Sequence, residues 1–251
     1  MPEGADPGRS GCGPDAIKFN MTDDLKKIYG DYWTARLGRA PSGENEIFET
    51  ALSVLKPGGS LLDAGCGDGA FLKLAAPLFG RVCGTDISEP AVGAVRALGL
   101  EAVQGELPGP LPFPGGTFDA CVLLDVIEHI ADPLAALKEL RRVLKPGGRL
   151  VLSTPNIRCF RHIYRLVFSG EFPRTTEDDF VWGGGHLHYF ARKDVTALIG
   201  RAGFSGPEFA LNPGQFGRSL KRRLLRLAAG ERLFGEFVEG SIIAVCVKGD
   251  L

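Results

Sequence analysis

Short apolar runs alternate with amphipathic segments along residues 60–156. The apolar runs predict buried strands, and the amphipathic segments predict helices that begin after Gly69, Ser88 and Asp132. Because neighbouring parallel strands need a crossover connection, this alternation predicts a parallel sheet with helices packed on it. A length of 251 residues fits a single domain of that kind. We therefore expect a doubly wound α/β fold.

Capping residues indicate where several helices begin. Ser88 with Pro90, and Asp132 with Pro133, are typical helix starts. Leucines at positions 134, 137, 140 and 144 form the stripe that would pack on the sheet. Further helices are expected over 17–37, 42–55, 194–202 and 218–229. The expected strands are 60–64, 81–85, 102–104, 118–124, 148–153, 204–211 and 241–247.

The two ends of the chain differ from this alternating region. Residues 1–16 contain Gly, Pro and charged residues with little to bury, so a disordered tail is expected. Residues 17–251 are expected to form one domain, with an aromatic arm over 17–41. The alternation is interrupted at 157–190 and 213–240, and both stretches are predicted to be inserts that cap the site.

Composition limits the partners and the compartment. Lys and Arg number 29 against 30 Asp and Glu, so no overall positive charge attracts nucleic acid, and none is expected as a partner. The sequence has neither an apolar run near the roughly 18 residues of a membrane span nor a leader-like beginning. Its six cysteines lack a C-x-x-C pair and are predicted to be free thiols. These features predict a cytoplasmic protein.

A glycine-rich turn, Gly65-Cys66-Gly67-Asp68-Gly69, follows the strand predicted at 60–64. Glycines at a strand-to-helix turn let backbone amides approach a ligand closely, and Gly65, Gly67 and Ala70 also satisfy the dinucleotide pattern. However, Asp63 and Asp68 would repel a pyrophosphate by roughly a few kcal/mol at intermediate dielectric. The same acids would favour a ligand that carries an ammonium and a sulfonium. That ligand is S-adenosylmethionine.

A second acidic residue is predicted at the same edge of the sheet. Asp86 ends the second strand, about twenty residues after the glycine turn, where a carboxylate can accept both hydroxyls of an adenosine ribose. The alternative is a helix cap, a role that suits Ser88 better. We therefore expect Asp86 to hold the ribose.

Four ordered segments carry a family resemblance: LLDAGCGDG, GTDIS, FDACVLLDVIEHIADP and LRRVLKPGGRLVLSTPN. Together they resemble the class I S-adenosylmethionine-dependent methyltransferases over about Leu61 to Asn156. Two later segments, HLHYF and RAGF, resemble the branch that includes the ubiquinone-biosynthesis O-methyltransferases. The resemblance implies a Rossmann-like seven-stranded sheet, mostly parallel with the last strand antiparallel, and a product S-adenosylhomocysteine.

The resemblance also implies which residues hold the cofactor. The methionine portion is assigned to Asp63, Gly65, Cys66 and Gly67, the ribose and adenine to Asp86 and Ile87, the adenine-side loop to Gly105, Glu106 and Leu107, and the methionine end after the fourth strand to Asp125 and Val126. One departure concerns the adenine side, where the family usually has Gly-Asp and this chain has Gly105-Glu106. We therefore rely on Asp86 more than on Glu106.

Methyl transfer mainly requires alignment of the acceptor with the methyl group, and alignment alone can supply roughly 7 to 11 kcal/mol. An acceptor hydroxyl would also need a base. His129 follows the fourth strand, and His186 and His188 follow a glycine run. We predict that His129 and His186 act on a small-molecule acceptor, most simply in O-methylation. The alternative is that these histidines only cap a helix or anchor loops.

Three further interpretations remain open. Asp125, Glu128 and His129 could hold a divalent ion, as some ubiquinone-type relatives are thought to do, but no metal is predicted here. The basic stretch Arg218 to Arg226 can be an interfacial helix, a docking face for an acidic substrate, or a solvated helix flank. Finally, a non-catalytic S-adenosylmethionine-binding protein or an NAD-dependent oxidoreductase would share parts of this pattern.

Overall fold

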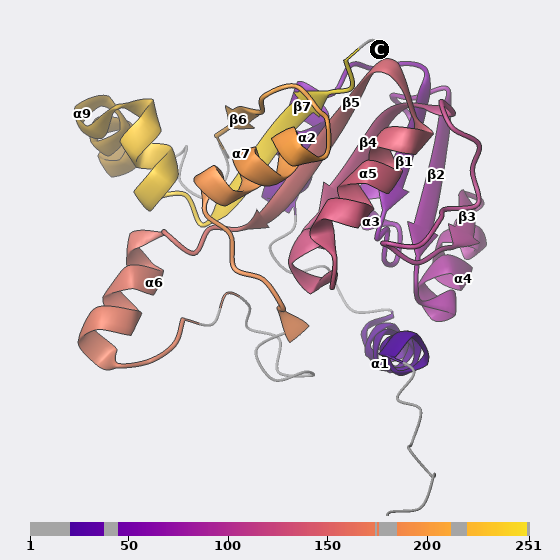
Figure 1. Cartoon of the computed structure of the whole chain (residues 1–251), viewed down its shortest axis with the longest axis horizontal. Coiled ribbons are helices and arrows are strands. Elements are labelled where there is room, and N and C mark those ends of the chain that lie inside the picture. The colour runs from indigo at the N-terminus through magenta and orange to yellow at the C-terminus, as the bar shows by residue number, and fades with distance from the viewer. Residues whose placement is uncertain (1–20, 38–44, 174, 176–184, 212–219, 250–251) are drawn as a thin grey trace, which may run out of the picture.

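The computed structural model of the chain describes residues 21–37, 45–173, 175, 185–211 and 220–249. Seven strands form one sheet in the order β3-β2-β1-β4-β5-β7-β6 (Figure 1). All strands run parallel except β7, which pairs antiparallel with both of its neighbours. The predicted seven-stranded Rossmann-like fold with an antiparallel last strand is therefore confirmed. The strands are β1 (Ser60–Ala64), β2 (Arg81–Asp86), β3 (Glu101–Gln104), β4 (Phe118–Leu124), β5 (Leu144–Pro155), β6 (Glu208–Ala210) and β7 (Ser241–Val247).

Helices cover both faces of the sheet, as the alternating pattern predicts. One face is buried by α2 (Asn45–Val54), α3 (Ala70–Ala75) and α4 (Glu89–Ala97). The other is buried by α5 (Pro133–Val143) and α7 (Arg192–Arg201), which lie in front of the sheet in Figure 1. Leu61 and Leu62 are both fully buried but belong to different core clusters, because side chains alternate across a strand.

Further helical segments of the described chain lie outside these layers. The N-terminal arm forms α1 (Met21–Arg36), whereas the predicted tail and the first residues of the helix predicted over 42–55 lie outside the described residues. The insert after β5 contains α6 (Phe160–Tyr164) and a π-helical turn, η2 (Arg165–Ser169). The helix α9 (Leu220–Phe237) bends at Gly230, whose φ is 74°. Among the described residues, no helix is long and apolar enough to cross a membrane.

Some boundaries differ from the prediction for local reasons. The predicted strand over 204–211 is wrong at its start, because the Phe204 amide donates to the carbonyl of Ile199 and so completes the end of α7. The leucine stripe of α5 also ends earlier than expected. Leu144 is fully buried in the same cluster as Leu137 but opens β5, where it pairs with Phe118.

The start of α5 is as predicted and can be tested directly. The Asp132 carboxylate accepts a hydrogen bond of 3.0 Å from the Ala135 amide, and Pro133 occupies the first turn. We expect Asp132→Ala to lower the free energy of unfolding by about 1 kcal/mol, because a helix amide loses its partner. Urea denaturation measures this change. Asp132→Asn is the control, since it keeps an acceptor oxygen, and equal losses in both variants would contradict the capping role.

Candidate active site

Three segments of the chain come close together after β1: the glycine turn itself, the loop after β4 and the helix α1. Gly65, Gly67 and Gly69 all have positive φ, between 51° and 82°, a region that favours glycine. A Cβ atom at Gly65 would overlap Val126, and one at Gly67 would overlap the ring of Trp33. The loop after β4 and the helix α1 therefore close directly onto this turn. Cys66, between these glycines, is buried, and its sulfur lies where a Cβ at Gly84 would be.

Asp86 ties the turn to the end of β2. One carboxylate oxygen accepts a hydrogen bond of 3.0 Å from the Gly67 amide, and the other accepts one of 2.9 Å from the Ser88 amide. Burial raises the pKa of Asp86, and these amide hydrogen bonds partly offset the rise. Each oxygen keeps a lone pair for a further donor, such as a ribose hydroxyl. Ser88 itself caps α4, as predicted, by accepting from the Ala91 amide at 3.3 Å.

Asp63 lies deeper at the same edge. Asp63 is only 3 % exposed. Burial raises the pKa of its carboxyl to about 8, with a smaller contribution from the Asp86 charge. No cationic side chain of the described part of the chain pairs with this carboxyl. A bound cation would therefore stabilise its ionised form. Asp68, by contrast, accepts from the Ala70 amide at 3.1 Å and supports the start of α3.

The adenine-side residues lie after β3, next to the ends of β2 and α1. The Gly105 amide donates to the Asp86 carbonyl at 3.0 Å, and a Cβ at Gly105 would overlap the buried hydroxyl of Thr85. Glu106 forms an ion pair of 3.5 Å with Lys26 of α1. Leu107 is half-buried against the core. Ile87 is half-buried, and its carbonyl accepts from the Gln104 amide group at 2.9 Å.

The loop after β4 brings Asp125 and Val126 to the glycine turn. Asp125 has a positive φ of 51°, a conformation that non-glycine residues seldom adopt. Its amide donates to the Ser153 hydroxyl at 2.9 Å, and that hydroxyl donates to the Asp125 carboxylate at 2.7 Å. These paired bonds hold the strained residue in place at the end of β4.

A cluster of titratable side chains lies directly beyond this loop, in the single 3₁₀ turn η1 (Ile127–His129) and in the segment that begins at Gly185. The rings of His129 and His186 are 4.6 Å apart, and Nε2 of His186 lies 4.0 Å from Oε1 of Glu128. The Glu128 backbone carbonyl accepts from the amides of Leu187 and His188 at 2.8 and 3.0 Å. These hydrogen bonds fix the segment that contains His186 and His188 against η1.

The environment keeps both of these imidazoles neutral. Burial lowers the pKa of His129, and burial together with the charge of His129 lowers the pKa of His186 to about 4. Burial and the neighbouring Asp125 hold the pKa of Glu128 well above its usual range. His188 is not part of this cluster, because its ring lies against Phe190.

The tautomer of His129 follows from its partner. Nδ1 of His129 lies 3.2 Å from the Gly185 carbonyl, which can only accept, so Nδ1 carries the proton. Nε2 therefore keeps a free lone pair that can accept a proton. His186 is oriented differently, since its Nδ1 lies 2.6 Å from the Thr175 hydroxyl, a group that can donate or accept.

The structure changes the composition of the candidate metal group. Glu128, His129 and His186 offer ligand atoms that all lie within 4.8 Å of one another, and Oε1 of Glu128 is buried without a hydrogen-bond partner in the described structure. Asp125, which the sequence suggested as a ligand with Glu128 and His129, instead accepts a hydrogen bond from the Ser153 hydroxyl. That no metal is used remains a prediction.

Several residues at the site were missed by the sequence analysis. Tyr29 of α1 places its ring 6.1 Å from His129, and burial raises its pKa to about 12. Trp33 packs on Gly67, and Thr175 contacts His186. Only the aromatic character of the arm pointed to α1. The hydroxyls of Ser153 and Thr154 could have been found, since they lie near the carboxyl end of β5, next to β4.

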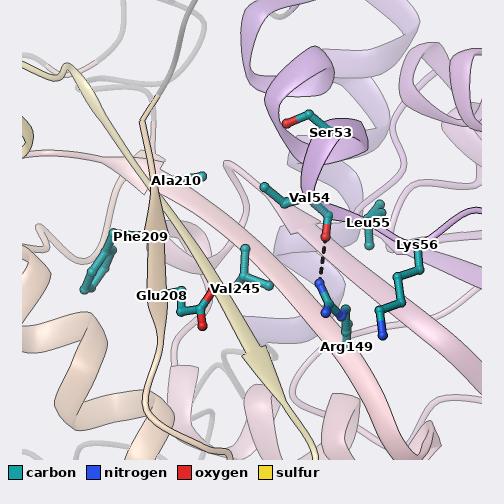
Figure 2. Close-up of a pocket in the computed structure, with 9 residues that line it drawn as sticks. All are labelled: Ser53, Val54, Leu55, Lys56, Arg149, Glu208, Phe209, Ala210 and Val245. Carbon is teal, nitrogen blue, oxygen red and sulfur yellow. Dashed lines mark hydrogen bonds between the residues drawn. The ribbon is translucent and has the colours of Figure 1, made fainter.

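A separate hollow in the surface does not belong to this site. It lies between the end of α2 and the strands β5, β6 and β7, where the Arg149 guanidinium donates to the Val54 carbonyl at 3.0 Å (Figure 2). Arg149 lies in the amino-terminal half of β5, where it pairs with Val247 of β7. The candidate site is at the opposite, carboxyl ends of the parallel strands, where ligands bind in sheets of this type.

Comparison with known proteins decides between the ligands that such an edge can hold. Residues 35–206, more than half of the chain, match the model of a methyltransferase domain. This chain belongs to the S-adenosylmethionine-dependent methyltransferases. The membership favours a cationic ligand over a dinucleotide, in agreement with the acids at the turn.

Individual relatives resemble parts of this methyltransferase. A probable S-adenosylmethionine-dependent methyltransferase of Mycolicibacterium smegmatis is 36% identical over 69% of this chain and 60% of its own length. The ubiquinone biosynthesis O-methyltransferase of Xanthomonas campestris is 36% identical over 42% of this chain and 47% of its own. The chain thus spans about half the length of the curated relatives it matches. A solved methyltransferase of Thermotoga maritima shares the fold, with a TM-score of 0.60 at 17% identity over 91% of this chain and 99% of that one.

The residues of the site fit S-adenosylmethionine. The buried Asp63 carboxyl lacks a cationic partner among the described residues, and Asp86 has acceptor capacity left. The Thr85 hydroxyl is buried beside Gly105 without a hydrogen-bond partner in the described structure. The individual contacts of the assigned residues with the cofactor stay predictions.

The raised pKa of Asp63 predicts a pH dependence of stability. Between its unfolded pKa of about 4 and its folded pKa of about 8, the folded chain binds more protons, so stability falls as the pH rises through that window. The slope contributed is at most about 1.4 kcal/mol per pH unit. Thermal unfolding of the cofactor-free protein measures it. Asp63→Asn should flatten the slope, and an unchanged slope would contradict the assignment.

Substitutions of Asp86 and of Glu106 should affect cofactor affinity differently. Asp86→Ala should weaken S-adenosylmethionine binding by about 1.5 to 3 kcal/mol, as expected for lost hydrogen bonds to a charged group. Glu106→Gln should change affinity far less, because Glu106 already pairs with Lys26. Calorimetric titration of both variants provides the comparison. Equal affinities for Asp86→Ala and the parent, in a folded variant, would refute the ribose role.

Proposed function

We propose that this methyltransferase transfers a methyl group to an oxygen of a small-molecule acceptor, with His129 as the general base. S-adenosylmethionine, when bound, would supply the methyl group from its sulfonium, and S-adenosylhomocysteine would be the leaving group. The observation that carries the proposal is the orientation of His129. Its Nδ1 faces the Gly185 carbonyl at 3.2 Å, so the lone pair on Nε2 is free for the acceptor's proton.

The charge state of the cluster supports this role. A base must be unprotonated at the working pH, and burial lowers the pKa of His129 below its ordinary value of 6.5. His186 is neutral as well, and its contact with Thr175 fixes its ring beside His129. We assign His186 the role of positioning the acceptor hydroxyl. The relatives named ubiquinone biosynthesis O-methyltransferases support oxygen as the acceptor atom.

Alignment of the acceptor is assigned to the elements around this cluster. Tyr29 of α1 reaches His129, and Thr175 of the insert over 157–190 reaches His186. We propose that the arm and the inserts together enclose the acceptor and exclude water. The parts of the inserts at 176–184 and 213–219, and Arg218 with them, lie outside the described residues. The cytoplasmic location and the contact through Arg218 to Arg226 remain predictions from the sequence.

The acceptor can be identified and catalysis tested in one experiment. The protein is incubated with S-adenosylmethionine labelled in its methyl group and with a cell extract, and labelled small molecules are identified by mass spectrometry. A labelled methyl ether supports the proposal. Cofactor binding without any S-adenosylhomocysteine formation would instead indicate a non-catalytic binding protein. Because no metal is predicted, EDTA should leave the labelling unchanged.

Two variants of His129 separate a base from a loop anchor. His129→Ala should lower kcat for the labelled acceptor about 10²- to 10⁴-fold, the usual contribution of a general base. His129→Asn can still donate to the Gly185 carbonyl but offers no basic nitrogen, so an equal loss is expected. Recovery of activity in His129→Asn would show that the histidine only anchors the loop. The parent's kcat should fall only as the pH drops below about 6.5, where imidazole becomes protonated.

A further inference from the structure

The insert that follows β5 exposes an unusual concentration of apolar side chains. Phe168 is 74% exposed and Val167 is 63% exposed. In the segment 160–172, which we term the apolar segment, six large apolar side chains are more than half exposed: Phe160, Tyr164, Leu166, Val167, Phe168 and Phe172. Large contiguous apolar surfaces on a folded chain mark interaction sites.

The base of this segment is firmly attached to the fold. Cys159 and Pro173, which flank it, are buried. The Asn156 side-chain amide donates to the Glu239 carbonyl at 2.9 Å, and Arg158 forms an ion pair of 3.0 Å with Glu236. The apolar side chains are therefore presented outward from a fixed base.

The charges around the apolar segment are mainly positive. Residues 156–172 contain three arginines, at 158, 161 and 165, and one acidic residue, Glu171. The stretch 218–229, which includes the first half of α9, contains five Lys or Arg and no acidic residue. In Figure 1, α6 and α9 project from the same end of the molecule, beyond the edge of the sheet.

We propose that the apolar segment docks this methyltransferase on the surface of an anionic lipid membrane. Aromatic and aliphatic side chains flanked by arginines suit the boundary between headgroups and acyl chains, because the arginines meet lipid phosphates while the apolar groups leave water. A second copy of the chain is a poorer occupant. Two such faces would bring arginines of like charge together.

The surface is continuous with the candidate site. Phe172 contacts Tyr189 with ring centroids 5.0 Å apart, and Tyr189 lies 6.3 Å from the ring of His186. Docking through the apolar segment would thus hold the histidine side of the site close to the membrane surface. The docking itself does not depend on the acceptor or on catalysis.

Flotation with lipid vesicles tests the docking. The full chain is mixed with vesicles of phosphatidylcholine, with or without phosphatidylglycerol, at low and at high salt. We expect binding to the anionic vesicles at low salt, and weaker binding at high salt because salt screens the arginines. The double variant V167S/F168S should bind at least about tenfold more weakly, since it loses two apolar groups that enter the lipid. The matched control L74S/L78S changes two exposed leucines on and after α3 and should bind like the parent.

A fluorescent variant distinguishes insertion from adhesion. In Phe168→Trp, the indole emission should shift to shorter wavelength on anionic vesicles and be quenched by brominated acyl chains. The proposal is overturned if the parent floats with neither vesicle at low salt, or if V167S/F168S binds as well as the parent. It is also overturned if the parent forms a dimer that V167S/F168S abolishes while no vesicle is bound. Unchanged S-adenosylmethionine affinity in V167S/F168S confirms that the variant is folded.

Discussion

The hydrogen bond from the Gly67 amide to the Asp86 carboxylate joins the ends of β1 and β2, and the geometry of the candidate site depends on it. To make this 3.0 Å bond, the backbone after β1 must turn back over β2, which it does through left-handed φ values at Gly65 and Gly67. The absence of side chains there also lets Val126 and Trp33 close onto the turn. The glycines thus allow the loop after β4 and the helix α1 to pack against the turn.

The parallel pairing of β4 with β5 builds the other half of the site. Leu124 pairs with Ser153, so the residues that follow β4 meet hydroxyl groups at the end of β5. Ser153 bonds to Asp125, and the Thr154 hydroxyl donates to Glu128 at 3.1 Å. These hydroxyls make burial of the two carboxyls less costly, because a buried polar group needs a hydrogen-bond partner.

The sequence predicts best what depends on local pattern. The bounds of β1, β4 and β7, the cap at Asp132 and the placing of Asp86 at the strand edge all follow from short-range periodicity and turn residues. The parts that could not be predicted rest on contacts between distant segments. Tyr29 meets His129 across one hundred residues of sequence, and no periodic signal marks that contact. The strand predicted at 204–211 was too long because Phe204 completes the end of α7 and the ladder with β7 begins only at Glu208.

Both halves of the site disfavour charged side chains, and this supports the direction of the proposed chemistry. At one side, burial raises the pKa of Asp63 and Asp86, so a cation would be needed to keep them ionised at little cost. At the other, burial lowers the pKa of both His129 and His186, and the charge of His129 lowers the pKa of His186 further.

A sulfonium held near the acids would disfavour protonation of these imidazoles still further, because it adds a positive charge to the same enclosed space. In the proposed reaction, methyl transfer would remove that positive charge as the acceptor loses its proton. The imidazolium would then form at the moment when its electrostatic penalty falls. The net charge of the enclosed site would therefore be unchanged by the reaction, which a low-dielectric environment favours.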